Sequence, residues 1–290
     1  MTFPLSPPVL TPSLKLVLTL ALLGAVRPAC AQLQPASPQD TSAASSIVVP
    51  SLASAAPIRS IELDVGGEEL TNGYGNWTNE TLFGTYQVDQ QVLQVELSAK
   101  EEFRSSGTYL GLADTITIDQ DWFTRLSIGT GDGAFYLPRV RGDAFLSRKW
   151  LDQRNLITSI GVGYYEAPDG HIDRSLSFGS TYYFSTPWIL EGGLRFNRSD
   201  PGSISTHQQF LAVTYGHEKQ DVLTLRYGWG GEGYQEIAGN VSLVNFQSHE
   251  ASIAWRHWLN ANLGLLAKVD NYSNPYYQRK GANVGLFYQF

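Results

Sequence analysis

Two polar clusters in the sequence contain the residue types that serine hydrolases use. Ser205 lies two residues before His207, and Ser248, His249 and Glu250 are consecutive. A serine nucleophile needs a base within hydrogen-bond distance and a third group that orients the base. Neither cluster has the spacing of a barrel lipase, and Ser and His residues near strand ends are commonly interfacial polar residues. We therefore predict no catalytic residue and keep a lipid-modifying enzyme as the least favoured function.

The sequence does not predict a metal site, a cofactor site or a nucleic-acid partner. The five His residues are not grouped with Cys or carboxylates at metal-ligand spacing, so we predict no metal site. The glycines around Trp229 precede no predicted helix, which excludes a dinucleotide loop and leaves no predicted cofactor. The formal net charge of −7 and the lack of a basic stripe exclude a nucleic-acid partner.

The N-terminal part of the sequence predicts export of the chain. An apolar run over residues 16–26 is followed by Ala29-Cys30-Ala31, the small residues of a signal-peptidase site. We predict a cleaved signal peptide over residues 1–31, and its removal takes away the only Cys. Lipidation of Cys30 is the disfavoured alternative, because the residues just before it do not suit that modification. Residues 32–59 are rich in Ala, Ser and Pro, which predicts a disordered periplasmic segment.

From residue 60 onward, hydrophobic and polar side chains alternate, which predicts β-strands. Leu93, Val95 and Leu97 alternate with Gln94 and Glu96, and similar segments recur along the chain. Because strand side chains alternate between two faces, each segment has one apolar and one polar face. A soluble β-sandwich alternates too. Three features favour an all-β, antiparallel transmembrane β-barrel: aromatic residues at the ends of apolar faces, mixed charges with Gly and Ser on polar faces, and strands of about ten residues.

The connectors between these segments fall into two classes. Short periplasmic turns and longer outer loops are typical of such barrels. Counting hairpins predicts about 14 strands, within a range of about 12–16, in a barrel domain of residues 60–290. Strict alternation points Asp114 toward lipid, so we expect either a β-bulge there or a miscounted strand. The predicted short turns are at 89–91, 119–121, 152–154, 185–187, 218–220 and 260–262, and the predicted longer loops are near 71–77, 132–141 and 233–242.

The polar faces of the predicted strands define a set of charged residues that line the lumen. If the lumen is open, charges of both signs with Tyr165 and Tyr183 nearby suit the passage of a polyhydroxylated chain. If the lumen is filled, the same charges pair with one another and nothing passes. The predicted lumen-lining residues are Glu62, Asp64, Glu96, Lys100, Arg125, Glu191, Arg195, Arg226, Glu250, Arg256, Lys268 and Asp270.

The C-terminal strand has the most specific motif in the chain. Apolar residues alternate with polar residues and glycine, and the last residue is Phe290. The pattern looks like the β-signal of bacterial outer-membrane proteins, a final strand that is available for pairing and ends in an aromatic residue at the inner interface. The predicted assembly signal consists of Asn283, Gly285, Tyr288 and Phe290.

Several diffuse features are shared with a known family. They are Trp-Thr-Asn-Glu at 77–80, Tyr-Leu-Pro-Arg at 136–139, and hairpins that return on Tyr182-Tyr183 or Arg256-His257-Trp258. Through them, the span from about residue 61 to residue 290 resembles the YaiO-type outer-membrane β-barrels. No catalytic motif contributes to this match. The resemblance implies a barrel in the bacterial outer membrane and an association with the production or export of surface carbohydrate.

Together these observations predict a channel or export barrel of the bacterial outer membrane, and the resemblance implies surface polysaccharide as its cargo. Its expected partners are outer-membrane lipid, the barrel-assembly machinery, polysaccharide and a periplasmic export partner. The alternative is a non-conducting structural barrel, or one that binds glycans through loop 132–141, because surface loops commonly carry function.

Overall fold

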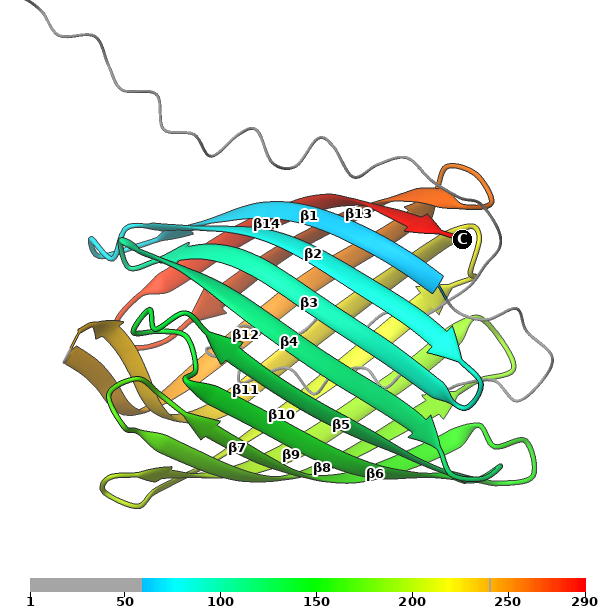
Figure 1. Ribbon diagram of the computed structural model, residues 1–290, viewed down its shortest axis with the longest axis horizontal. Helices are drawn as coiled ribbons and strands as arrows, with labels where there is room; N and C mark the ends of the chain where they lie inside the picture. Colours follow the sequence, from blue (N-terminus) through cyan, green and yellow to red (C-terminus); the bar gives the residue numbers. More distant parts are fainter. Residues whose placement is uncertain (1–58, 240) are drawn as a thin grey trace, which may run out of the picture.

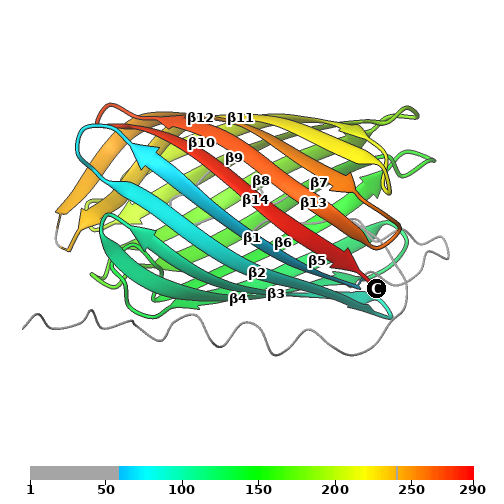
Figure 2. The same cartoon turned by 90° about the horizontal axis from the view of Figure 1, so that it is seen from above.

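The computed structural model describes residues 59–239 and 241–290, which form a closed antiparallel β-barrel of 14 strands. Each strand pairs with its neighbours in sequence, and β1 pairs with β14 to close the sheet (Figures 1 and 2). The predicted fold class and strand number are therefore confirmed. Apart from Arg59, the predicted signal peptide (1–31) and periplasmic segment (32–59) lie outside the described residues. Within those residues, no helix is long and apolar enough to cross a membrane.

Most strands have the length that a tilted strand needs to cross a bilayer. Twelve strands have 10 to 13 residues, and β11 and β12 have 18 each. All strands run obliquely to the barrel axis (Figure 1), as barrel closure requires. They are β1 (Arg59–Leu70), β2 (Asn76–Val88), β3 (Gln91–Glu102), β4 (Ser105–Thr117), β5 (Trp122–Gly131), β6 (Val140–Trp150), β7 (Leu156–Glu166), β8 (Ile172–Tyr183), β9 (Trp188–Asp200), β10 (Ile204–Gly216), β11 (Asp221–Ala238), β12 (Val241–Trp258), β13 (Leu263–Ser273) and β14 (Gln278–Gln289).

The six predicted short turns lie at one end of the barrel, which we call the turn end. The start of β1 and the C-terminal residue lie at the same end (Figure 1). In the turn before β5, Asp119 Oδ1 accepts hydrogen bonds from the backbone N–H groups of Asp121 (2.7 Å) and Trp122 (2.8 Å). Asn260 closes the turn before β13 in the same way. Short polar side chains that satisfy backbone donors therefore explain why these positions predict turns.

The opposite end, which we call the loop end, agrees with the prediction in two of three places. Residues 71–75 and 132–139 form connecting loops there. The third prediction, a loop near 233–242, is wrong, because β11 continues to Ala238 and β12 starts at Val241. The two strands pair with each other here as a hairpin, with one shift of register between Glu236 and Ala238. Cross-strand pairing therefore forms strands in a segment whose glycines alone predict a loop.

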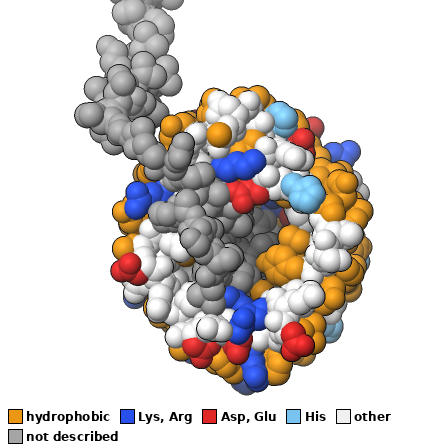
Figure 3. Space-filling view, turned by 90° about the vertical axis from the view of Figure 1, so that its right-hand side faces the viewer, with side chains coloured by type: hydrophobic (Ala, Val, Ile, Leu, Met, Phe, Trp, Pro, Cys, Tyr) orange, Lys and Arg blue, Asp and Glu red, His pale blue; other side chains and the backbone are white. Residues whose placement is uncertain are grey.

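The outer face of the barrel is hydrophobic around its circumference. Large apolar side chains such as Leu97, Ile128 and Val162 are about half exposed. Figure 3, which views the turn end, shows hydrophobic side chains around the rim. Near this end the outward side chains form an aromatic girdle, as a membrane interface requires. Its exposed members are Tyr86, Trp150, Phe184, Trp188, Tyr215, Trp255 and Tyr288.

Asp114 faces outward, and neither explanation that the sequence offered for it is correct. The pairing of β4 with β3 and with β5 is continuous through Asp114, so no β-bulge is present and the strand is counted correctly. Its neighbours across the sheet are Leu93 and Leu126, both exposed on the outer face. The Oδ1 atom of Asp114 has no hydrogen-bond partner among the described residues. The carboxylate therefore lies on the apolar face, three residues from the end of β4.

The C-terminal strand β14 is bonded on both sides. It pairs with β13 and, along nearly its whole length, with β1. The Phe290 N–H group donates a hydrogen bond to the Arg59 carbonyl oxygen at 3.0 Å. The Tyr288 ring stacks on the Phe290 ring at 6.1 Å. The predicted assembly signal therefore lies on the strand that completes the barrel, and its recognition by assembly machinery stays a prediction.

Candidate functional site in the barrel lumen

All twelve charged residues predicted to line the lumen occupy inward-facing positions of their strands. On β3, for example, Leu93, Val95 and Leu97 are exposed, whereas Gln94 and Glu96 between them are buried. The same alternation places the other predicted residues inside the barrel. The alternation does not reveal which charges meet, because that depends on pairing between strands far apart in the sequence.

Both signs of charge occur on every side of the lumen, but two sides differ in which sign is in excess. The arginines Arg125, Arg141, Arg195 and Arg226 lie on β5, β6, β9 and β11. The carboxylates Glu62, Asp64, Glu96, Glu250 and Asp270 lie on β1, β3, β12 and β13, which are grouped around the junction of β1 and β14. We call these the arginine wall and the acidic wall. The arginine side also has the carboxylates Asp143, Asp173 and Glu191, on β6, β8 and β9.

Cations on the acidic wall are paired with carboxylates. Arg256 Nη2 lies 2.6 Å from Glu62 Oε1, and Arg279 Nε lies 3.0 Å from Glu68 Oε2. Lys268 Nζ is 3.7 Å from Asp270 Oδ1. The Arg256 guanidinium also stacks on the inward-facing ring of Phe287, 4.0 Å from its centroid. The first two pairs join β1 to β12 and to β14 across the closure of the barrel, whereas the third lies within β13.

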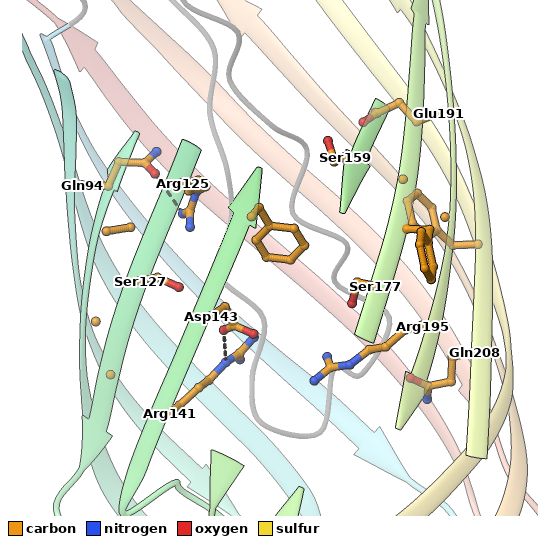
Figure 4. Close-up of a pocket in the computed structure, with 18 of the residues that line it drawn as sticks. Gln94, Arg125, Ser127, Arg141, Asp143, Ser159, Ser177, Glu191, Arg195 and Gln208 are labelled. Carbon is orange, nitrogen blue, oxygen red and sulfur yellow. Dashed lines mark hydrogen bonds and ion pairs between the residues drawn. The ribbon is translucent and has the colours of Figure 1, made fainter. Parts of the chain in front are cut away.

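The arginine wall borders an open region of the lumen. Arg141 Nε lies 3.0 Å from Asp143 Oδ2, and Arg125 Nη2 donates a hydrogen bond to Gln94 Oε1 at 3.0 Å. Arg195 points from the opposite side toward Asp143 and Arg141 (Figure 4). Its Nε atom has no hydrogen-bond partner among the described residues. Guanidinium groups therefore face the space between β5 and β9 from two sides.

A cavity with an empty volume of about 1330 Å³, part of it open to solvent, lies between these residues. Its polar lining includes Gln94, Ser127 and Gln208, and its apolar lining includes Phe145 and Phe210. Guanidinium, amide, hydroxyl and aromatic groups together are able to bind a hydroxylated or anionic solute by hydrogen bonds and stacking.

Aromatic rings lie flat against the lumen wall where the adjacent strand has glycine. Phe145 and Phe210 are paired across strands with Gly161 and Gly193. A Cβ atom at either glycine would lie 2.2 Å from the ring. The Arg226 guanidinium then stacks over Phe210 at 3.8 Å from the centroid. These glycines therefore leave room for rings that would otherwise project into the cavity.

Loop 132–139 folds inward at the loop end. Its Tyr136 hydroxyl donates a hydrogen bond to the Lys100 carbonyl oxygen at 2.8 Å, and Leu137 is fully buried. Burial raises the pKa of Tyr136, so the hydroxyl stays protonated as the donor. Phe135 packs against an aromatic cluster that contains Leu70, Trp77, Phe103, Leu243, Phe246, Tyr272 and Tyr277. The mouth at this end is therefore partly covered by packed aromatic side chains.

The serine and histidine clusters do not assemble a catalytic triad in this structure. Ser205 and His207 are both exposed on the outward positions of β10. Ser248 and Glu250 face inward, whereas His249 lies between them on the exposed outer face. The His249 Nδ1 atom lies 3.0 Å from the Tyr227 hydroxyl, a neighbour on the outer face of β11.

Sequence reasoning missed several lumen residues. Arg141 and Asp143 form part of the tripeptide Arg141-Gly142-Asp143, which is too short to predict a function. Their positions two apart on a strand would have placed both on one face. Arg279 and Glu68 come from opposite ends of the barrel sequence, so only the pairing of β1 with β14 brings them together. Of the predicted aromatic residues, Tyr165 lines a second cavity near the loop end.

The closed 14-strand sheet, its apolar circumference and its polar interior define a transmembrane β-barrel of the outer membrane. Residues 58–235, more than half of the chain, match the YaiO membrane beta barrel domain, and the chain belongs to this family. The resemblance seen in the sequence is therefore confirmed, although Arg256-His257-Trp258 lies beyond the matched residues. The turn end is accordingly the periplasmic end and the loop end is the outer end.

Solved structures with a similar fold are outer-membrane proteins. A CymD monoaromatic hydrocarbon channel has a TM-score of 0.56 and 8% identity, over 80% of this chain and 88% of that one. A bacterial polysaccharide outer membrane secretin has a TM-score of 0.53 and 11% identity, over 79% and 98%. An outer membrane channel from Pseudomonas putida F1 has a TM-score of 0.50 and 9% identity, over 84% and 100%. At such identities the likeness concerns the fold. A comparison with curated proteins found no match.

Proposed function

We propose that this barrel is a passive outer-membrane channel that selects polar solutes by charge and binds acidic, polyhydroxylated chains in its lumen. The observation that carries the proposal is the arginine wall beside a cavity of about 1330 Å³. A set of fixed cations attracts anions into a pore and slows the passage of cations. Carboxylates and sulfates of acidic sugars match the donor geometry of guanidinium groups.

The lining chemistry further favours a sugar chain over a small inorganic ion as the natural solute. Gln94, Ser127 and Gln208 supply amide and hydroxyl groups next to the arginines, and Phe145 and Phe210 supply flat apolar surfaces. Export or uptake of surface polysaccharide fits this lining. The occurrence of a polysaccharide secretin among proteins of similar fold is compatible with the proposal.

Single-channel recording in planar bilayers tests the proposed function. We expect a stable, ohmic conductance from the purified protein, and reversible block by an oligosaccharide that carries carboxylates. A neutral oligosaccharide of the same length is the matched probe, and we expect it to block less. Absence of conductance from protein that shows heat-modifiable gel mobility, and is therefore folded, would refute the channel and favour a structural or glycan-binding barrel.

A further inference from the structure

The hairpin formed by the outer parts of β11 and β12 projects beyond the barrel wall. Strand β10 pairs with β11 only as far as Gly230, and β13 pairs with β12 only from His249 onward. Residues 231–239 and 241–248 therefore pair only with each other and not with β10 or β13, and we call them the projecting hairpin (Figure 1). One of its inward side chains, Glu236, is 8% exposed. This residue is outside the membrane-spanning part of β11.

A tight turn between β7 and β8 lies against this hairpin. The Ala167 N–H group donates to the His171 carbonyl oxygen at 2.8 Å, and Gly170 has a φ of +90°, which favours glycine. Asp169 Oδ1 accepts a hydrogen bond from the His171 N–H group at 3.0 Å. The turn therefore presents the Asp169 carboxylate and the His171 imidazole side by side.

Asp169, His171 and Glu236 converge at this contact. One ligating atom from each residue lies within 4.8 Å of the other two. The His171 ring is held against the Tyr234 ring at 4.1 Å, and the Tyr234 hydroxyl donates to the Pro201 carbonyl oxygen at 2.6 Å. The imidazole is thus fixed in place by the same hairpin that carries Glu236.

The charges around this cluster favour a cation. The Glu236 carboxylate lies beside the Asp169 carboxylate, and Asp173 and Glu232 line the adjoining cavity. Two adjacent carboxylates of this kind need a shared proton or a metal ion between them.

We propose that Asp169, His171 and Glu236 bind a divalent transition-metal ion of the zinc or manganese class at the outer mouth of the barrel. One imidazole nitrogen and two carboxylate oxygens suit these ions better than calcium or magnesium, which prefer oxygen ligands throughout. Bonds of about 2.0–2.2 Å place two ligand atoms of one ion at most about 4.4 Å apart. His171 Nδ1 is in hydrogen-bond contact with Asp169 Oδ2, so these two side chains move apart to admit the ion between them.

The ion joins two segments that are far apart in the sequence. It fastens the turn at residues 167–171 to the projecting hairpin and so stiffens one side of the mouth. Three protein ligands leave a coordination position open. His171 and Glu236 also line a cavity of about 650 Å³ of empty volume, together with Tyr165, Asp173 and Gln208, from which a solute reaches the ion. A carboxylate or hydroxyl group of a solute is able to occupy the open position. The proposal departs from the sequence-based expectation of no metal site, because Glu236 is remote from Asp169 and His171 in the sequence.

Titration of the folded, chelator-treated barrel with Zn²⁺ and Mn²⁺ in a calorimeter tests the site. We expect one bound ion per chain, and at least a tenfold loss of affinity in His171→Asn and in Glu236→Gln. His249→Asn is the matched control, because His249 is also near the outer end but lies on the exposed face; its affinity should equal that of the unchanged chain. Heat-modifiable mobility verifies that each variant is folded.

A second measurement keeps the proposal testable if one variant fails to fold. Limited proteolysis of the unchanged chain should cut the projecting hairpin several-fold more slowly with Zn²⁺ than with chelator. No heat of binding to the unchanged chain, or binding that both variants retain, overturns the site. If Asp169, His171 and Glu236 hold only a shared proton, the unchanged chain will give no heat of binding.

Discussion

Replacing Arg195 by Glu reverses one charge in the lumen and tests whether the arginine wall selects ions. Arg195 lies on an inward position of β9 and points toward Arg141 and Asp143 across the cavity (Figure 4). An ion in water that passes about 6 Å from a unit charge changes its energy by about 0.7 kcal/mol. Charge reversal doubles the difference to about 1.4 kcal/mol, and screening at about 0.1 M salt reduces it to about 0.8 kcal/mol.

Anions and cations shift in opposite directions, so their permeability ratio changes by about 1.5 kcal/mol, or roughly tenfold in favour of cations. The reversal potential of a bilayer that separates two KCl concentrations measures this ratio. Arg198→Glu is the matched control, because Arg198 lies on the same strand with its side chain exposed on the other face. A reversal potential that Arg195→Glu leaves unchanged, with conductance intact, refutes an open pore lined by this residue. Equal shifts in both variants would also refute it.

Three further changes test the barrel itself. Gly161→Ala places a Cβ atom 2.2 Å from the Phe145 ring. We expect this variant to lose roughly 1–3 kcal/mol in the free energy of unfolding, measured in urea. Gly84→Ala is the control and should cost less, because a Cβ atom at Gly84 has no atom within 4 Å. Asp114→Leu removes an unpaired carboxylate from the apolar face and should stabilise the barrel by about 1 kcal/mol in the same assay; a loss of stability would contradict its outward position. Deletion of Phe290 should lower the amount of protein in the outer membrane, measured by fractionation, and normal amounts would contradict the assembly signal.

The strand pattern could be predicted from the sequence because one face of the sheet contacts lipid and the other contacts water. Lipid outside and water inside impose a period of two, and Leu93, Gln94, Val95 and Glu96 follow it in the structure as they do in the sequence. Polar turns are local as well, since Asp119 satisfies backbone donors only two and three residues away. These features depend on neighbours in the chain, and a single sequence contains them.

Features that depend on remote neighbours could not be predicted. The outer parts of β11 and β12 are strands because they pair with each other, although their glycines indicate a loop. The contact between Arg279 and Glu68 requires the closure of β14 on β1. Asp114 is a different case: alternation placed it correctly, and the expectation of a bulge arose from the cost of a carboxylate near lipid. That cost is small near an interface, which explains why the strand tolerates it.

The proposed channel separates entry from charge selection along its axis. Loop 132–139 and the aromatic cluster cover part of the outer mouth, and Phe135 links the two. Arg125 and Arg195 lie deeper, in the middle of β5 and β9. A solute that enters from outside therefore meets aromatic surfaces before it meets Arg125 and Arg195. If this order is correct, changes at Phe135 alter the rate at which a sugar chain enters but leave the ion permeability ratio unchanged, whereas a reversed charge at Arg195 does the opposite. Both effects in one variant would mean that the mouth and the arginine wall form a single constriction.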